Sequence, residues 1–160
     1  MPLLNIVSNK SFSSLEKQDI AKEITNLMIE TWRVLPDKIQ VQILSVSDDE
    51  MYRGGVAPTN RAFLCLSRKI SLDSNEYYKI PVKNLNIEKL LVVSIDTWTG
   101  VSFVDKSSLV KKITEYFVEK YKILGDNVVI YIREIIPENW FQNGISGRHP
   151  NFLNKSRNLE

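Results

Sequence analysis

Hydrophobic and polar residues follow two periods along this chain, one typical of strands and one typical of helices. Residues 3–7 form a short apolar run that predicts a strand. Ser13 and Glu16 fit a capping box, in which each side chain bonds the backbone of the other residue, so a helix is predicted over residues 14–32. The face of this helix repeats at helical spacing: Ile20, Ile24, Leu27, Met28 and Thr31. Residues 39–43 alternate with period two and predict a second strand, which completes a β-α-β unit.

The second half of the chain repeats this order. Residues 90–95 predict a strand, and Asp105 is placed to cap a helix. The apolar face of that helix is formed by five residues: Leu109, Ile113, Tyr116, Phe117 and Tyr121. The Gly-Asp pair at 125–126 is typical of a helix end, and residues 128–132 predict a final strand. The helix caps are 105 − 13 = 92 residues apart and the following strands 128 − 39 = 89, which indicates an internal duplication.

Two such units predict an α/β (α+β) fold, with four strands in one sheet and two helices on one face, because each parallel pair needs a right-handed crossover. The chain is expected to form a single domain. Its parts are a first unit (2–47), a connecting insertion (48–89), a second unit (90–144) and a C-terminal arm (145–160). Gly144, Gly147 and Pro150 argue against a regular element in the arm. The uncovered sheet face is expected to be apolar, which predicts self-association.

Composition narrows the classes of function. The chain has 160 residues, 43% of them apolar, and a net charge of +2, so it lacks the basic excess of nucleic-acid binders. No apolar run approaches the ~20 residues that span a bilayer, and the N-terminal residues do not form a signal peptide. One cysteine, Cys65, cannot form an internal disulfide, which favours the cytoplasm. With a single histidine and no glycine-rich phosphate loop, neither a metal site nor a cofactor is expected.

Pro2 is the sharpest chemical feature of the sequence. Removal of Met1 would leave a terminal secondary amine, which no internal residue can supply. A terminal amine has a pKa near 8 in water, and a pocket of low dielectric lowers that pKa. The neutral amine is then a general base or a nucleophile at physiological pH. The alternative is structural, because a proline is harmless at the first position of an edge strand.

Three further stretches lie in a suggestive order: Ala-Lys-Glu-Ile-Thr at 21–25, Met-Tyr-Arg-Gly-Gly at 51–55 and Ile-Pro-Glu-Asn-Trp-Phe-Gln-Asn-Gly at 136–144. With Pro2 at the start of a duplicated β-α-β chain, the sequence resembles the tautomerase superfamily. Its length and its fused double unit look like those of the branch that includes cis-chloroacrylic acid dehalogenase. The resemblance implies a homotrimer with its active site around the terminal proline. It also implies keto–enol tautomerisation or hydration of small unsaturated acids.

The resemblance assigns roles to individual residues. Pro2 matches the catalytic proline, and Tyr131 falls where the dehalogenase branch has an active-site tyrosine. Gln142 falls where that branch has an activating glutamate, and because an amide cannot take a proton from water, hydrolytic dehalogenation is not expected. Met28 falls where that branch has a substrate-binding histidine. The segment 96–103, where the family has carboxylate-binding arginines, contains none.

An anionic substrate therefore needs another cation. Arg133 is the candidate, because it lies two residues from Tyr131 and shares its strand face; the alternative is an exposed charge at the strand end. Trp98 would make the substrate pocket more apolar. Arg53 and Arg61 could reach the site from loops, although solvated loop charges are the simpler interpretation.

The predicted function is that of a tautomerase-like enzyme. Pro2 is its base, Tyr131 orients the substrate, and Arg133, Gln142, Met28 and Trp98 bind it. The substrate would be a small carbonyl or unsaturated compound, with no nucleic acid and no membrane as partner. The alternative is a degenerate relative that binds a ligand, or assembles, without turnover, because the arginine, histidine and glutamate positions are all unmatched.

Overall fold

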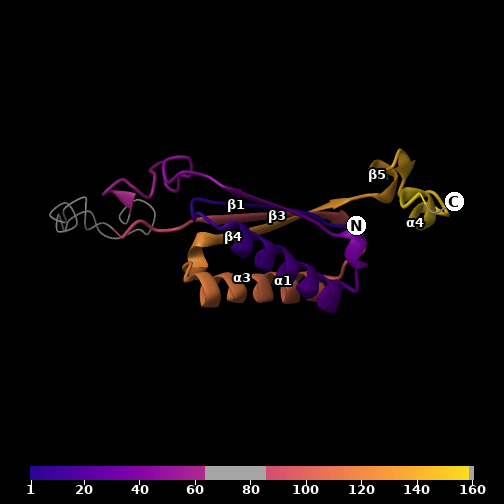
Figure 1. The fold of residues 1–160 in the computed structure, drawn as a ribbon, viewed down its shortest axis with the longest axis horizontal. Coiled ribbons are helices and arrows are strands. Elements are labelled where there is room, and N and C mark those ends of the chain that lie inside the picture. The colour runs from indigo at the N-terminus through magenta and orange to yellow at the C-terminus, as the bar shows by residue number, and fades with distance from the viewer. Residues whose placement is uncertain (64–85, 159–160) are drawn as a thin grey trace.

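The computed structural model describes residues 1–63 and 86–158 (Figure 1). Two β-α-β units carry most of the regular structure: β1 (Leu3–Ser8), α1 (Ser14–Trp32) and β2 (Gln40–Ser45), then β3 (Leu91–Trp98), α3 (Phe103–Tyr121) and β4 (Val128–Ile135). Single 3-10 turns occupy Pro36–Lys38, Gly125–Asn127 and Pro137–Asn139, and the chain continues through β5 (Phe141–Gln142), β6 (Ile145–Ser146) and α4 (Phe152–Ser156). Cys65 and most of the polar stretch 71–86 lie outside the described residues.

The four long strands form one sheet in the order β2-β1-β3-β4. Strands within each unit are parallel, and β1 and β3 join the two units in antiparallel pairing. Figure 1 shows α1 and α3 together on one face of this sheet, so the predicted fold class is confirmed. The register places Leu3 opposite both Gln40 and Asp96, and Asp96 opposite Arg133. This row of four residues crosses the sheet at the end where the chain begins.

Capping decides where the two helices begin and end. The capping box of Ser13 and Glu16 is present, as predicted. The prediction that Asp105 caps the second helix is wrong, because the Ser102 hydroxyl accepts a hydrogen bond from the Asp105 backbone and is the N-cap. That helix also ends before Gly125, at Tyr121, with Lys122 in the left-handed conformation (φ 56°). Arg33 after α1 is left-handed as well (φ 54°), so a left-handed cap ends each helix, and in α3 it does so before the predicted glycine signal is reached.

With these boundaries the duplication has one constant offset. The N-caps are 102 − 13 = 89 residues apart, and the left-handed C-caps 122 − 33 = 89. The 3-10 turns that precede β2 and β4 are 125 − 36 = 89 apart. The larger spacing expected from Asp105 arose from placing the second cap three residues too late.

The duplication extends beyond the β-α-β units into a small hairpin. Gln142 pairs with Ile145, and Arg53 pairs with Val56 in the same antiparallel sense, 89 residues earlier. Both turns have two residues with positive φ, at 54–55 and at 143–144, as a tight two-residue hairpin requires. The run Phe-Leu-x-x-Ser-Arg also occurs twice in the sequence, at 63–68 and 152–157. The start of the expected insertion is therefore the counterpart of residues 140–152.

The C-terminal segment is a packed part of the fold, which corrects the expectation of an arm without regular structure. The short helix α4 begins after Pro150, and its Phe152 is 4% exposed. The Phe152 ring lies 5.4 Å from the ring of Trp98. Gly147 permits this approach, because a Cβ there would meet Trp98 at 2.5 Å. Aromatic burial therefore holds the segment against the end of the sheet.

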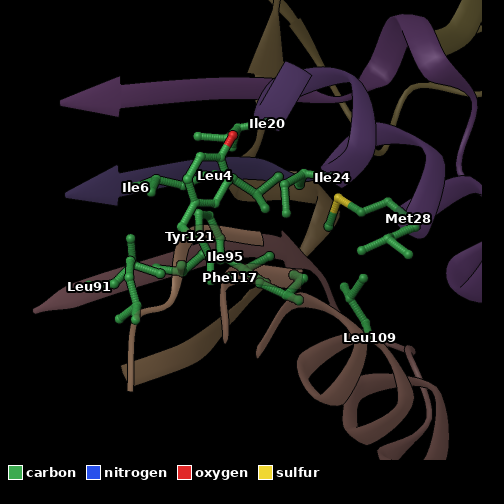
Figure 2. Close-up of a cluster of buried hydrophobic side chains, with 14 of the residues drawn as sticks. Leu4, Ile6, Ile20, Ile24, Met28, Leu91, Ile95, Leu109, Phe117 and Tyr121 are labelled. Atoms are coloured by element: carbon green, nitrogen blue, oxygen red, sulfur yellow. The ribbon is translucent and has the colours of Figure 1, made fainter. Parts of the chain in front are cut away.

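The hydrophobic core lies between the sheet and the two helices (Figure 2). Alternate residues of β1 and β3 supply the sheet side, as period-two strands with one covered face require. The helices supply residues at the predicted spacing: Ile20, Ile24, Leu27, Met28, Leu109, Ile113, Phe117 and Tyr121. The predicted apolar faces of both helices are thus confirmed.

The open face of the sheet is mixed in polarity, and the expectation of an apolar face holds for only part of it. One row across the strands is apolar, with Leu44, Val7, Val92 and Val129 in register. The next row is polar, with Gln42, Asn5, Ser94 and Tyr131. Alternation along a strand dictates which face a residue occupies, but not whether that face is uniformly apolar.

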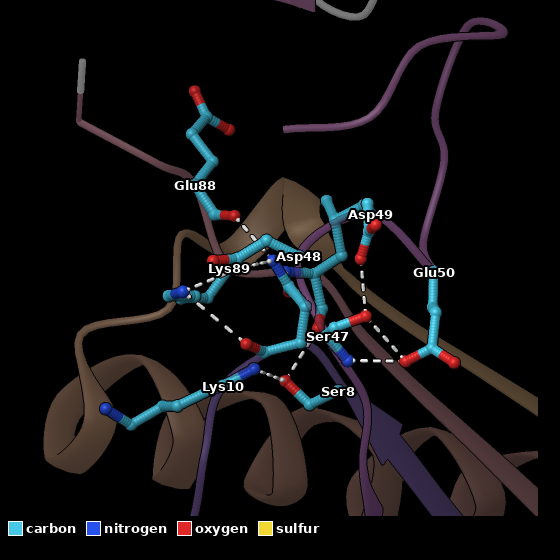
Figure 3. Close-up of polar contacts among 10 residues, drawn as sticks. Ser8, Lys10, Ser47, Asp48, Asp49, Glu50, Glu88 and Lys89 are labelled. Carbon is cyan, nitrogen blue, oxygen red and sulfur yellow. Dashed lines mark hydrogen bonds and ion pairs between the residues drawn. The ribbon is translucent and has the colours of Figure 1, made fainter. Parts of the chain in front are cut away.

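A polar cluster fixes the end of the sheet away from the chain terminus (Figure 3). The Asn9 side chain donates to Asp48 Oδ1 at 2.8 Å and accepts from the Leu90 backbone at 2.7 Å. Lys89 Nζ also reaches Asp48 Oδ1, at 2.7 Å. These contacts tie the ends of β1 and β2 to the start of β3 with satisfied hydrogen bonds, as partly buried polar groups require.

Candidate active site

A pocket of about 220 Å³ surrounds the chain terminus, and we call it the N-terminal pocket. It is lined by Met1, Pro2, Leu3, Asp37, Lys38, Gln40, Trp140, Phe141 and Gln142. The Gln40 backbone donates to the Pro2 carbonyl at 3.2 Å, so parallel pairing of β1 with β2 brings the turn that carries Lys38 beside the terminus. Figure 1 shows β5 and α4 at the same end of the sheet. The pocket therefore joins segments more than 100 residues apart.

The terminal amine of this pocket is held in a state suited to proton transfer. Its pKa is lowered from 8.0 to about 6, first by burial and second by the charge of Lys38. Burial acts because an apolar surrounding disfavours the charged form, and a like charge acts in the same direction. In the chain as described the amine belongs to Met1, and Pro2 itself is buried beside it. At neutral pH this amine is largely unprotonated.

Lys38 is a site residue that sequence reasoning missed. It is 4% exposed, and its Nζ donates to Ser156 Oγ at 2.8 Å and to Gln142 Oε1 at 3.2 Å. Burial lowers the pKa of Lys38, and the charge of Arg157 acts in the same direction, whereas Asp37 opposes it. The sequence did contain a signal for Lys38. It lies directly before a predicted strand, and that strand pairs in parallel with the strand that begins after Pro2. The contact with Ser156, however, exists only in the folded chain.

Of the predicted site residues, the structure brings Pro2 and Gln142 together in the N-terminal pocket. Tyr131 and Arg133 lie on the open face of β4 instead. Arg133 forms two hydrogen bonds to Asp96, at 2.6 and 2.8 Å, and lies over the Tyr131 ring at 5.6 Å. Its charge is therefore already balanced by a carboxylate, and the interpretation as an exposed strand-end charge fits its half-exposed side chain.

Met28 and Trp98 have structural surroundings that do not fit their predicted roles. Met28 is fully buried in the core among Ile24, Leu109 and other apolar side chains (Figure 2). It is not among the residues that line the N-terminal pocket, so its position in the core does not fit the predicted role in substrate binding. Trp98 packs against Phe152 and Gly147, so it supports α4 from behind instead of lining the pocket.

A second pocket, of about 150 Å³, is built from the equivalent positions of the other repeat. It is lined by Met51, Tyr52, Arg53, Leu90, Leu91, Val92, Asp126, Asn127 and Val129. Each of these residues lies 89 positions from a residue of the N-terminal pocket, in one direction or the other. Arg53 belongs to this pocket, so the loop arginine suggested as a substrate contact does not reach Pro2.

The two pockets share one polar arrangement with its partners exchanged. In the second pocket Arg53 Nη1 donates to the Asn127 side chain at 2.5 Å, and the guanidinium lies 5.5 Å from the Phe63 ring. In the N-terminal pocket Lys38 donates to Gln142 and lies 5.4 Å from the Phe152 ring. In the second pocket the cation, Arg53, comes from the hairpin, and the amide, Asn127, comes from the 3-10 turn. In the N-terminal pocket the cation, Lys38, comes from the turn, and the amide, Gln142, comes from the hairpin.

Several solved structures share this architecture. Native fused 4-OT matches with a TM-score of 0.67 and 12% identity, covering 91% of this chain and 96% of its own. A member of the cis-3-chloroacrylic acid dehalogenase family matches with a TM-score of 0.65 and 14% identity, covering 96% and 88%. FG41 malonate semialdehyde decarboxylase gives 0.57 and 15%, covering 87% of both chains. This chain has the tautomerase fold. Comparisons with protein-family profiles and with curated proteins find no match.

The tautomerase fold is trimeric in several of these structures. The R7 fused 4-OT forms an asymmetric trimer, and the Q0 fused 4-OT forms a symmetric one. Within residues 1–63 and 86–158 of this chain, no helix is long and apolar enough to cross a membrane. The same residues contain no group of three His, Cys, Asp or Glu side chains that could hold a metal ion.

Proposed function

We propose that the chain is a tautomerase-like enzyme in which the amine of Pro2, freed by removal of Met1, is the general base. The neutral nitrogen takes a proton from the carbon beside a carbonyl, and the electron pair moves to the carbonyl oxygen as an enolate. Return of the proton to oxygen, or to another carbon, completes an isomerisation. The observation that carries this proposal is the position of the chain terminus in the pocket. With Met1 in place, burial and the charge of Lys38 lower the pKa of its amine to about 6, and Pro2 lies buried directly beside it, so a freed Pro2 amine would meet the same burial and the same charge.

The size and lining of the pocket support a small substrate. About 220 Å³ accommodates a compact carbonyl compound, with Trp140 and Phe141 as apolar walls. Gln142 would bind a polar edge of the substrate through its amide. Because an amide cannot deprotonate water, the pocket favours proton transfer at carbon over hydrolytic chemistry.

We further propose that the active form is a homotrimer, as in the fused 4-OT structures. The mixed sheet face that carries Tyr131 is open in the single chain, and a neighbouring copy would cover it. Tyr131 would then orient a substrate only at such an interface. Arg133 is a weaker candidate for binding an anion, because its Nε and Nη2 already donate to the Asp96 carboxylate.

A second candidate function is binding without turnover. The observation that favours it is the recurrence of the cation–amide pair in the second pocket, where no chain terminus exists. That recurrence supports a structural role for the pair, in which it holds a hairpin in place. The proposed carbon-acid chemistry therefore requires the terminal amine, which only the N-terminal pocket can have.

The test begins with the intact mass of the purified chain, which reports whether Met1 is present. Ketonisation of phenylpyruvate enol is then measured for the processed protein and for a version extended by one glycine before Pro2. The extension turns the proline nitrogen into an amide without a basic lone pair, and loss of a general base costs ~100-fold or more in rate. Arg53→Met, in the equivalent pocket, is the control and retains the rate. Equal rates for the processed and extended proteins would exclude the Pro2 mechanism.

A further inference from the structure

Lys38 is a buried cation whose hydrogen-bond partners carry no charge. Its ammonium donates to a glutamine carbonyl and to a serine hydroxyl, and an aromatic ring lies against it. Such groups satisfy the donors of an ammonium but leave its charge in place. A charge buried without a counter-ion is costly, so buried ions are normally paired.

The nearest carboxylate, Asp37, is shared between Lys38 and a second cation, Arg157. Asp37 Oδ2 is 3.9 Å from Lys38 Nζ, beyond hydrogen-bond length. Both Asp37 oxygens accept from Arg157, at 2.7 and 2.8 Å, in the two-pronged geometry that guanidinium favours. Among the residues that the structure describes, the charged groups around Lys38 are Asp37 on its own turn, Arg157 at the end of α4 and the terminal amine before β1. One carboxylate there faces both Lys38 and Arg157, which leaves positive charge at the pocket.

We infer that Lys38 binds a small organic anion in the N-terminal pocket, and that α4 belongs to the site because Ser156 holds the Lys38 ammonium at the pocket wall. The inference deepens the proposed function and rests on it in one respect: the anion would be the substrate or its enolate. A preorganised cation of this kind stabilises negative charge at little reorganisation cost.

The chemistry of the pocket narrows the class of anion. Trp140 and Phe141 line the same 220 Å³ as Lys38, so a flat apolar body with one negative group fits best. The lowered pKa of the terminal amine agrees with this arrangement, since Lys38 is one of its two causes. A bound anion would offset that repulsion, so ligand binding and protonation of the amine are coupled.

The experiment uses benzoate as the probe and benzamide as its uncharged counterpart. Both are titrated at low salt by calorimetry and by amide NMR shifts, with the full chain. We expect benzoate to bind and to perturb the backbone at Lys38, Gln142 and Ser156, with benzamide at least tenfold weaker. Lys38→Met should weaken benzoate at least ~10-fold, as expected for loss of a charged hydrogen bond. Ser156→Ala should weaken it less, because the charge remains.

Two further variants test the anion site independently of Lys38→Met. Gln142→Glu places a carboxylate beside Nζ and should abolish benzoate binding even if Lys38→Met fails to fold. Arg53→Met removes the matching cation of the second pocket and should leave benzoate affinity unchanged. The inference would be overturned if folded Lys38→Met or Gln142→Glu bound benzoate with unchanged affinity. It would also be overturned if benzamide bound as tightly as benzoate, or if only Arg53→Met lost benzoate affinity. No effect of Ser156→Ala would overturn the role of α4.

Failure of this inference is distinguishable from failure of the proposed function. Lys38-dependent benzoate binding without turnover of any carbonyl compound would reject the enzyme and keep the anion site. Turnover that depends on the free Pro2 amine, but is indifferent to Lys38, would keep the enzyme and reject the anion site.

Discussion

The two pockets of this chain have the same frame and different chemistry. Nine lining positions correspond at a constant offset, and each pocket holds one cation bonded to one amide above a phenylalanine ring. The decisive difference lies at the positions equivalent to Met1 and Pro2, where the second pocket has Leu90 and Leu91 in mid-chain. A backbone nitrogen inside the chain is an amide and cannot act as a base. Duplication thus copied a pocket, but only one copy can have a terminal amine.

A second difference concerns the cation. The guanidinium of Arg53 is anchored by Asn127 and by the backbone carbonyl of Asp126, at 3.0 Å. Lys38 instead offers a compact ammonium that is almost entirely buried. A guanidinium stays charged in any protein environment, whereas burial readily shifts the pKa of a lysine. The N-terminal pocket therefore couples two amines, and the second pocket contains no such pair.

The largest effect expected within this comparison comes from the paired turns. Gly55 (φ 79°) and Gly144 (φ 69°) are equivalent, and a Cβ at either would meet nothing within 4 Å. Alanine at each should therefore cost only backbone strain, about 1–2 kcal/mol of unfolding free energy. Urea denaturation measures this cost. Gly144→Ala should also reduce turnover, since it displaces Gln142, whereas Gly55→Ala should not. Equal loss of turnover in both variants would contradict the assignment of one active pocket.

A smaller effect is expected on the pKa of the terminal amine. Lys38→Met should raise that pKa from about 6 toward 8.0, and by less than half of the difference, because burial is the larger cause. Arg53→Met should leave it unchanged. Reductive methylation with ¹³C-formaldehyde, followed by NMR titration, reads the amine directly and does not depend on turnover. A similar shift in both variants would mean that Lys38 acts through the global charge and not through the pocket.

The smallest effect is the change that Lys38→Met makes to the pH dependence of stability, because Lys38 is the lesser cause of the lowered amine pKa. The amine has a folded pKa of about 6 and an unfolded value of 8.0, so the unfolded chain takes up this proton first as pH falls. The unfolding free energy should therefore be highest above about pH 8, decrease between about pH 8 and 6, and level off below. Denaturation curves at the two limits measure this. The slope should be shallower for Lys38→Met and unchanged for Arg53→Met; a slope of opposite sign would show that the amine is not buried as described.

Much of the fold was predictable because its signals are local. The strand after Pro2, the capping box of Ser13 and Glu16 and the buried faces of both helices follow from spacing alone. The second cap was missed because both Ser102 and Asp105 are good capping residues. Only the backbone geometry shows that Ser102 accepts the hydrogen bond, with Asp105 in the first turn.

The site was less predictable, since its contacts are remote in sequence. Met28 has the spacing of a core residue, and the structure places it in the core, against the role implied by family resemblance. Arg133 was correctly placed on the face of Tyr131, but its partner Asp96 lies on another strand, and no local pattern reveals that pairing. In the sequence Lys38 cannot be told from a surface lysine, because its hydrogen bond to Ser156 joins residues that are 118 positions apart.

The sequence by itself determined the elements, their order, the duplication and the presence of a proline that can become a terminal amine. These depend on periodicity, capping and covalent chemistry, which act over a few residues. Tertiary structure alone decided which cation meets that amine and which is neutralised by a carboxylate. It also decided that the hairpin and α4 close one pocket while their counterpart forms another. The physical reason is that strand register and aromatic packing bring distant side chains within a few ångströms, where burial and charge act on each other.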